Sequence, residues 1–171
     1  PEQLQIRDQG FRTPIRVINL MDHSAGFEDR ALGHLFERRF DRVRSLENYL
    51  RQERPRRVRA PGEIASYSNY GAALAGEALS YVSGKPFEQL IEQEILRPLA
   101  LDHTTFREPH PAKAGLPATM PSALSRDLSE GYRWTPGGYQ TRDFEFIEQV
   151  GPAGSASSTA ADMGRYMLLL L

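Results

Sequence analysis

The sequence predicts a single domain, residues 1–171, that is predominantly α-helical and carries one β-hairpin. Apolar residues recur at helical spacing after Ser68, after Pro86 and after Thr159. Aromatic residues between 130 and 146 flank Pro136-Gly137-Gly138, which is the pattern of a hairpin. With 171 residues, of which 40% are apolar, the chain can bury roughly two thirds of its unfolded surface in one core.

The composition excludes several classes of protein. The 21 basic and 22 acidic residues nearly balance, so we expect no nucleic acid and no anionic membrane as partner. There is no cysteine, which excludes disulfides and thiolate chemistry, and the four histidines are too scattered to suggest a metal site. We therefore expect no metal and no cofactor. No apolar run approaches the roughly 20 residues of a membrane-spanning helix.

The two ends of the sequence suggest a piece of a longer protein. The chain begins at Pro1 without an initiator Met and stops at Leu171 inside a predicted helix. Any targeting signal would then lie outside it.

The first 26 residues predict one short helix. Residues 1–12 show too little pattern for more than extended or irregular structure. Thr13 is placed as an N-cap and Pro14 as the first helical residue, with Ile15, Ile18 and Met21 on one face and Gly26 as the stop. Asp22, His23 and Ser24 hold an acid, an imidazole and a hydroxyl, but sequence neighbours point in different directions. We favour a helix end held by side-chain hydrogen bonds over a local triad.

Residues 29–59 are rich in charge and contain ten arginines. They could form an anion-binding patch, but we favour solvated surfaces with pairs between arginines and acids. A short helix is predicted over 45–53 with Leu46 and Leu50 inward, ended by Pro55.

Two consecutive helices are predicted next. Ser68 or Asn69 can cap the first, and Gly84 ends it. Its predicted apolar face is Tyr70, Ala73, Leu74, Ala78, Tyr81 and Val82. The second helix begins at Pro86, buries Phe87, Leu90, Ile91 and Ile95, and closes at Arg97-Pro98.

The last third alternates loops with regular elements. Five prolines between 98 and 128 predict a long loop. The hairpin aromatics Tyr132, Trp134, Tyr139, Phe144 and Phe146 could hold a ligand, but we favour packing in a core or interface. Residues 151–155 read as a small-residue loop. Thr159 and Asp162 then cap a final helix, whose end at Leu168–Leu171 we expect to be buried.

Complete catalytic motifs are absent, and Tyr67-Ser68-Asn69 is the remaining candidate for chemistry. The sequence has no Gly-x-Ser-x-Gly elbow, no His-Glu-x-x-His, no Walker loop and no Gly-x-Gly-x-x-Gly. A tyrosine carries protons at neutral pH only where nearby positive charge favours the phenolate, and a lysine close to a serine can supply that charge. Asn69 offers an amide donor and an acceptor. On the tripeptide alone, we favour a structural role in which Tyr67 packs and Asn69 caps the helix.

The surrounding residues resemble the penicillin-recognising serine hydrolases, the family of class C β-lactamases, D-Ala-D-Ala carboxypeptidases and related esterases. The likeness lies in Pro61-Gly62, residues 67–71, residues 82–87, residues 95–99 and His103-Thr104. Residues 18–26 resemble the family's Leu-Leu-x-His-x-Ser-Gly segment, and residues 153–166 its Ala-Gly-Gly-x-x-Ser-Thr-Ala-x-Asp-Leu segment. The resemblance covers roughly 13–106 and 150–171.

The resemblance implies an α+β fold in which a mostly helical domain, built from the middle of the chain, joins an α/β domain built from both ends. It implies that Tyr67 is the catalytic general base or acid and that Asn69 binds substrate in the cleft, whereas Ser68 has no catalytic role. The family's Ser-x-x-Lys and its Lys-Thr-Gly or His-x-Gly motif do not occur here. A central fragment explains both absences, and such a fragment alone should be inactive.

Three functional hypotheses remain. The first is part of an exported serine hydrolase, periplasmic or extracellular, that forms an acyl-enzyme with a D-alanyl peptide, β-lactam or ester. The second is a non-catalytic binding module that keeps the cleft without the nucleophile. The third is a helical domain with a structural likeness only. The first two imply a small-molecule or peptide substrate as partner.

Overall fold

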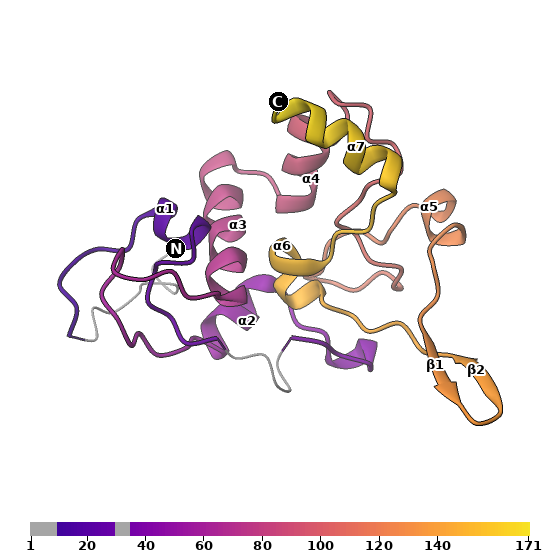
Figure 1. Ribbon diagram of the computed structural model, residues 1–171, viewed down its shortest axis with the longest axis horizontal. Helices are drawn as coiled ribbons and strands as arrows, with labels where there is room; N and C mark the ends of the chain where they lie inside the picture. The colour runs from indigo at the N-terminus through magenta and orange to yellow at the C-terminus, as the bar shows by residue number, and fades with distance from the viewer. Residues whose placement is uncertain (1–9, 30–34) are drawn as a thin grey trace.

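Helix α3 (Asn69–Ser83) is the central element of the computed structural model, which describes residues 10–29 and 35–171. Short helices surround it, namely α1 (Val17–Met21), α2 (Leu46–Gln52), α4 (Phe87–Ile91) and α6 (Gly151–Gly154) (Figure 1). The main core lies between α3 and these neighbours and includes Leu20, Phe27, Leu50, Tyr70 and Val150. The predicted architecture, mostly helical with one hairpin, is confirmed.

Helix α3 begins and ends as predicted. The Ser68 hydroxyl accepts a hydrogen bond from the backbone N–H of Gly71 at 3.1 Å, and Gly84 ends the helix with φ of 68°. The first half of its predicted face is buried, but Tyr81 and Val82 are exposed, Val82 to 85%. The core therefore covers the start of α3 and leaves its end in solvent.

Helix α1 is shorter than predicted. It begins at Val17, and Thr13 and Pro14 lie before it. The reason is Asn19, whose Oδ1 accepts a hydrogen bond from the Arg16 backbone N–H at 2.9 Å and so sets the helix start there. Ile15 is partly buried against the core, but Ile18 and Met21 are exposed and Leu20 is buried instead, so the predicted apolar face is wrong for Ile18 and Met21. The prediction for residues 1–9 lies outside the described residues.

The arginine-rich stretch forms ion pairs, as favoured. It contains the 3-10 helix η2 (Phe40–Arg42) and the predicted helix α2, which Ser45 caps. Arg30 lies outside the described residues. Pairs between described residues of this stretch and acidic partners include Arg38–Glu145, Arg39–Asp41 and Arg44–Glu53.

The second predicted helix forms as α4 followed by a π-helical turn, η3 (Glu92–Leu96). The proline-rich segment after it is mainly loop, as predicted. It ends in a short helix that the sequence did not predict, α5 (Ser122–Arg126), which begins directly after Pro121.

The hairpin consists of β1 (Tyr132–Thr135) and β2 (Gly138–Thr141), with Trp134 opposite Tyr139. It projects from one end of the molecule (Figure 1). Tyr132, Trp134 and Tyr139 are consequently exposed, so core packing is wrong for these three aromatics. Beyond the hairpin, Phe144 and Phe146 do pack together, with ring centroids 5.1 Å apart.

The C-terminal segment contains the 3-10 helix η4 (Glu148–Val150), then α6 and α7 (Ala160–Leu169). The predicted loop at 151–155 is one helical turn, because Pro152 presets the φ of its start. Thr159 caps α7 by accepting from the Asp162 N–H at 3.2 Å, as predicted.

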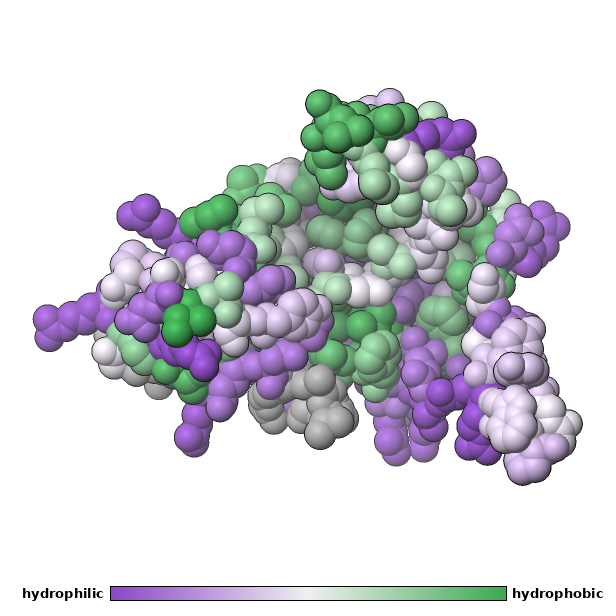
Figure 2. Space-filling view, viewed as in Figure 1, coloured by the Kyte–Doolittle hydropathy of each residue, from purple (hydrophilic) through white to green (hydrophobic). Residues whose placement is uncertain are grey.

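The apolar end of α7 is not buried as predicted. Leu168 to Leu171 are exposed and form part of the apolar surface at the top of Figure 2. Helix α7 is held instead by a polar anchor, the fully buried Asp162, which accepts from the His103 N–H and the Thr104 hydroxyl, both at 2.8 Å. Within the described residues, no helix combines the length and apolarity needed to cross a membrane.

Candidate active site

Tyr67 and Asn69 meet at the N-terminal end of α3. Ser68 between them is extended, with φ of −149° and ψ of 111°, and Asn69 is the first helical residue. The Tyr67 hydroxyl donates a hydrogen bond to Oδ1 of Asn69 at 2.9 Å. Ser68 is 2% exposed and its hydroxyl caps the helix. The structure thus brings Tyr67 and Asn69 together and leaves Ser68 in a structural role.

Asp29 determines the orientation of the Asn69 side chain. Its Oδ1 accepts from the Asn69 backbone N–H at 3.2 Å and from the Asn69 Nδ2 at 3.4 Å. With Nδ2 directed to a carboxylate, Oδ1 faces the Tyr67 hydroxyl. The second N–H of this amide has no partner among the described residues.

His23 lies against Tyr67 on the other side. The two ring centroids are 4.7 Å apart with the ring planes tilted by 39°. The Ser68 backbone N–H donates to Nδ1 of His23 at 3.3 Å. Tyr67 is nevertheless 58% exposed, whereas Asn69 is buried. The Tyr67 ring thus packs against His23, while more than half of the residue remains exposed and accessible to a ligand.

The two lysines of the chain make their hydrogen bonds away from the Tyr67 hydroxyl. Lys85 Nζ donates to Gln93 at 2.8 Å, and Lys113 Nζ donates to the backbone oxygen of Val43 at 2.7 Å.

Residues 22–26 form the end of α1, as favoured, and not a triad. Oδ1 of Asp22 accepts from the Ser24 N–H at 2.9 Å and from the Ser24 hydroxyl at 2.6 Å. The hydrogen bond from the Ser24 hydroxyl lowers the pKa of the Asp22 carboxyl. His23 bonds to Ser68 instead of to these two neighbours.

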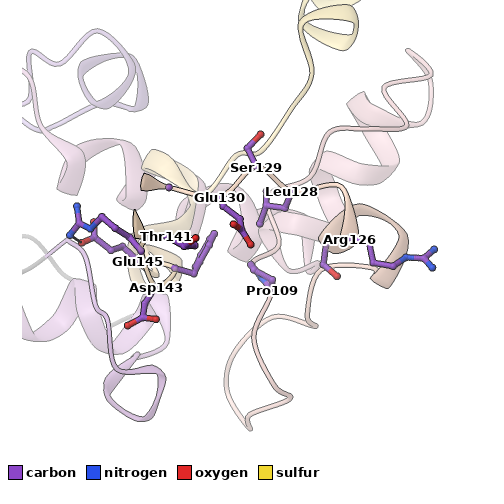
Figure 3. A pocket seen from close by; sticks show the side chains of 12 residues that line it. Pro109, Arg126, Leu128, Ser129, Glu130, Thr141, Asp143 and Glu145 are labelled. Atoms are coloured by element: carbon purple, nitrogen blue, oxygen red, sulfur yellow. Dashed lines mark hydrogen bonds and ion pairs between the residues drawn. The ribbon is translucent and has the colours of Figure 1, made fainter. Parts of the chain in front are cut away.

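An open cavity of about 500 Å³ lies elsewhere, between Pro109, the end of α5 and the base of the hairpin (Figure 3). Its lining is mixed in charge and includes Arg126, Arg142, Glu130, Asp143 and Glu145, of which Arg142 pairs with Glu145. Tyr67, Asn69 and His23 do not line it. Of the aromatic residues around the hairpin, Phe144 lines this cavity, whereas Tyr132, Trp134, Tyr139 and Phe146 do not.

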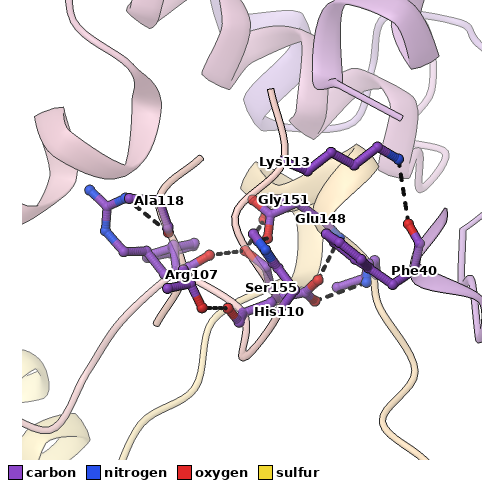
Figure 4. A network of polar contacts seen from close by, with 12 residues as sticks. Phe40, Arg107, His110, Lys113, Ala118, Glu148, Gly151 and Ser155 are labelled. Carbon is purple, nitrogen blue, oxygen red and sulfur yellow. Dashed lines mark hydrogen bonds and ion pairs between the residues drawn. The ribbon is translucent and has the colours of Figure 1, made fainter. Parts of the chain in front are cut away.

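A second polar cluster is buried at the centre of the molecule (Figure 4). The Glu108 carboxylate accepts from the backbone N–H groups of Ile147 and Glu148 at 2.8 and 3.0 Å. Glu148 Oε2 lies 3.3 Å from Nε2 of His110, and both side chains are fully buried. Burial raises the pKa of Glu108 to about 7 and, together with the charge of Glu108, that of Glu148 to about 8.

His23 and Asp29 are the residues of this site that the sequence did not assign to it. The sequence indicates His23 only as part of a helix end, and Asp29 only as one charge in the arginine-rich stretch. A signal for His23 was present, because residues 18–26 match the Leu-Leu-x-His-x-Ser-Gly segment of the resembled family. For Asp29 we find no such signal.

This chain is similar to known proteins over most of its length. A family model described as Beta-lactamase matches residues 4–171. The D-alanyl-D-alanine-carboxypeptidase/endopeptidase AmpH of Escherichia coli (strain K12) is 34% identical over 95 residues, which is 55% of this chain and 25% of the relative. The chain therefore spans about a quarter of the length of that relative.

Two solved structures share the fold. The octameric penicillin-binding protein homologue from Pyrococcus abyssi matches 97% of this chain and 37% of its own, with a TM-score of 0.69 and 24% identity. The beta-lactamase/D-alanine carboxypeptidase from Yersinia pestis, complexed with citrate, matches 100% of this chain and 44% of its own, with a TM-score of 0.67 and 23% identity.

Proposed function

Because this chain belongs to the beta-lactamase family of serine hydrolases, we propose that it forms the helical part of an enzyme that acts through an acyl-enzyme. The nucleophile segment with Ser-x-x-Lys and the segment with the sheet motif would come from other parts of the protein. The substrate class is a D-alanyl peptide, a β-lactam or an ester. The D-alanyl peptide has support from the name of the Escherichia coli relative.

The observation that carries this proposal is the hydrogen bond from the Tyr67 hydroxyl to Asn69 at 2.9 Å, beside an open face. Acyl transfer needs a group that takes the proton from the attacking serine and returns it to the leaving nitrogen or oxygen. In this role Tyr67 first gives up its own proton; as the phenolate it takes the serine proton, and as the phenol it returns that proton to the leaving nitrogen or oxygen. The free N–H of Asn69 would bind the substrate carbonyl or amide oxygen.

A catalytic tyrosine requires a cation close to its oxygen, because only then is the phenolate accessible at neutral pH. Lys85 and Lys113 are both engaged elsewhere, as described above. The lysine of a Ser-x-x-Lys motif is therefore the group that the proposed mechanism needs.

The test uses the full-length protein and compares Tyr67→Phe with Tyr139→Phe, the same change at an exposed tyrosine on the hairpin. Acylation is followed with a fluorescent penicillin or a fluorophosphonate, and turnover with a D-alanyl-D-alanine peptide and a simple ester. We expect Tyr67→Phe to slow turnover by about 100-fold or more, as for loss of a general acid or base, and Tyr139→Phe to have no effect. Unchanged acylation and turnover in Tyr67→Phe would remove Tyr67 from proton transfer.

A non-catalytic binding module is the second candidate, and it is favoured by the absence of any Ser-x-x-Lys in these residues. It predicts that the wild-type full-length protein takes up no label. In that case the D-alanyl-D-alanine peptide should still bind in calorimetry, and Asn69→Ala should weaken that binding.

A further inference from the structure

His23 holds the segment that carries Tyr67 at three points. The backbone oxygen of His23 accepts from the Ser66 N–H at 2.7 Å, and its Nδ1 accepts from the Ser68 N–H at 3.3 Å. These two donors are the residues immediately before and after Tyr67. The third point is the ring of His23, which packs against the phenol ring itself.

The hydrogen bond from Ser68 determines the tautomer of His23. A backbone N–H can donate only to a ring nitrogen that carries no proton. Nδ1 must therefore be the unprotonated nitrogen, and the ring proton of the neutral imidazole must lie on Nε2.

His23 adopts a conformation that L-residues seldom take. Its φ is 59°, in the left-handed region, which His, Asn and Asp tolerate better than other residues apart from Gly. Hydrogen bonds directly after it hold this conformation, from Ser24 to Asp22 and from the Asn19 amide to the Ser24 hydroxyl at 3.0 Å. A left-handed residue held in this way directs the imidazole at Tyr67 and Ser68.

We propose that His23, as the Nε2–H tautomer, is a positioning residue that sets the direction of the Tyr67 ring and thereby the path of its proton. This proposal rests on the proposed function of Tyr67. The Ser68 N–H occupies Nδ1 of His23, so this nitrogen takes up no proton from Tyr67. Its contribution is geometric, since a misplaced catalytic group loses rate even when it remains chemically intact.

Three variants of the full-length protein separate the backbone role of His23 from its side-chain role. His23→Gly tolerates the left-handed backbone but loses the acceptor and the ring. His23→Asn also tolerates that backbone, and its Oδ1 can replace Nδ1 as acceptor for the Ser68 N–H. His103→Asn, at an exposed histidine, is the matched control.

We expect kcat to fall about tenfold in His23→Gly, on the scale of one lost hydrogen bond and a displaced catalytic group. KM and the thermal midpoint should change little. His23→Asn should recover most of kcat, and His103→Asn should match wild type. A purely structural role predicts instead a lower thermal midpoint with unchanged kcat in the folded protein, and that result would overturn the proposal.

A spectroscopic test does not depend on activity. In protein labelled with ¹⁵N-histidine, the Nδ1 resonance of His23 should be that of an unprotonated, hydrogen-bonded nitrogen, and Nε2 should carry the proton. A proton on Nδ1 at neutral pH would contradict the proposal. The two proposals can also fail separately. If Tyr67→Phe leaves turnover unchanged, the proposed function fails. If only His23→Gly leaves kcat unchanged, the positioning role fails alone.

Discussion

Asp29 lies 40 residues before Asn69 in the sequence, yet its carboxylate accepts from both the backbone and the side chain of Asn69. The backbone N–H belongs to the first residue of α3, where helix N–H groups have no partner within the helix. A carboxylate at this end also interacts favourably with the helix dipole. One residue thus stabilises the helix start and orients the amide that faces Tyr67.

Replacing Asp29 should separate these two effects. Asp29→Ala removes both acceptor and charge, so we expect the free energy of unfolding to fall by about 1 kcal/mol. Asp29→Asn keeps an acceptor and should lose less than half of that. Urea unfolding followed by circular dichroism measures both, with Asp102→Ala at an exposed position as control. Equal losses in the alanine and asparagine variants would show that the charge alone matters.

At the scale of elements, the start of α3 depends on how closely the chain packs around Gly26. The segments 26–28 and 56–58 run side by side, with the Val58 N–H donating to the Gly26 oxygen at 2.8 Å and the Glu28 N–H to the Arg56 oxygen at 3.0 Å. This contact sets residues 23–29 beside the end of the segment that leads into Tyr67. The pairing of these two segments therefore determines where His23 and Asp29 lie.

Gly26 should be the least replaceable residue in this pairing. Its φ is 80°, and a Cβ there would lie 2.2 Å from the backbone oxygen of Arg59. Gly26→Ala therefore combines a left-handed alanine with a backbone clash, and we expect the free energy of unfolding to fall by about 3 kcal/mol or more.

Gly84→Ala is the matched control, because Gly84 has φ of 68° and open space around it. In Gly84→Ala the free energy of unfolding should fall only by the cost of placing alanine in the left-handed conformation, about 1–2 kcal/mol. Chemical unfolding compares the two variants. A loss in Gly26→Ala no greater than in Gly84→Ala would show that the segments can separate at little cost.

At the scale of the whole molecule, the buried cluster of Glu108, His110 and Glu148 joins distant parts of the chain. Glu108 and His110 come from the proline-rich loop, and Glu148 from η4. The His110 ring also stacks on Phe40 of η2, with centroids 5.0 Å apart. Two charged groups outside the cluster act on Glu148, namely Glu88 of α4 and Arg107, and Arg107 in turn pairs with Glu92 of η3.

The cluster should make stability depend on pH. An unfolded glutamate releases its proton near pH 4.5, whereas Glu108 and Glu148 keep theirs in the folded state to about pH 7 and about pH 8. Between these values the folded state binds more protons, so the free energy of unfolding falls as the pH rises from about 5 to 8. We expect the free energy of unfolding to fall by a few kcal/mol over this pH range.

Glu148→Gln should flatten this dependence and be more stable than wild type at pH 8.5, because the amide stays neutral. Glu63→Gln, at an exposed position, should leave the dependence unchanged. Urea unfolding at pH 5.5, 7 and 8.5 measures all three proteins. A wild-type protein that is equally stable at pH 5.5 and 8.5 would contradict the prediction.

Much of the site and fold was predictable where the determining residues are neighbours in sequence. The cap at Ser68, the stop at Gly84 and the hairpin around residues 136–138 follow from local backbone preferences. The exposure of the hairpin aromatics and of Leu168 to Leu171 was not predictable. Apolar spacing shows which face of an element could be buried, but only its packing partners decide whether it is.

By itself the sequence determined the mostly helical architecture and the family, and it placed Tyr67 and Asn69 on either side of one residue at a helix start. Only the tertiary structure decided that His23 and Asp29 flank this pair, and that Glu108 and Glu148 share a buried site. The physical reason is distance along the chain. Local dihedral preferences act over a few residues, whereas these contacts join residues about 40 apart and form only when whole segments pack together.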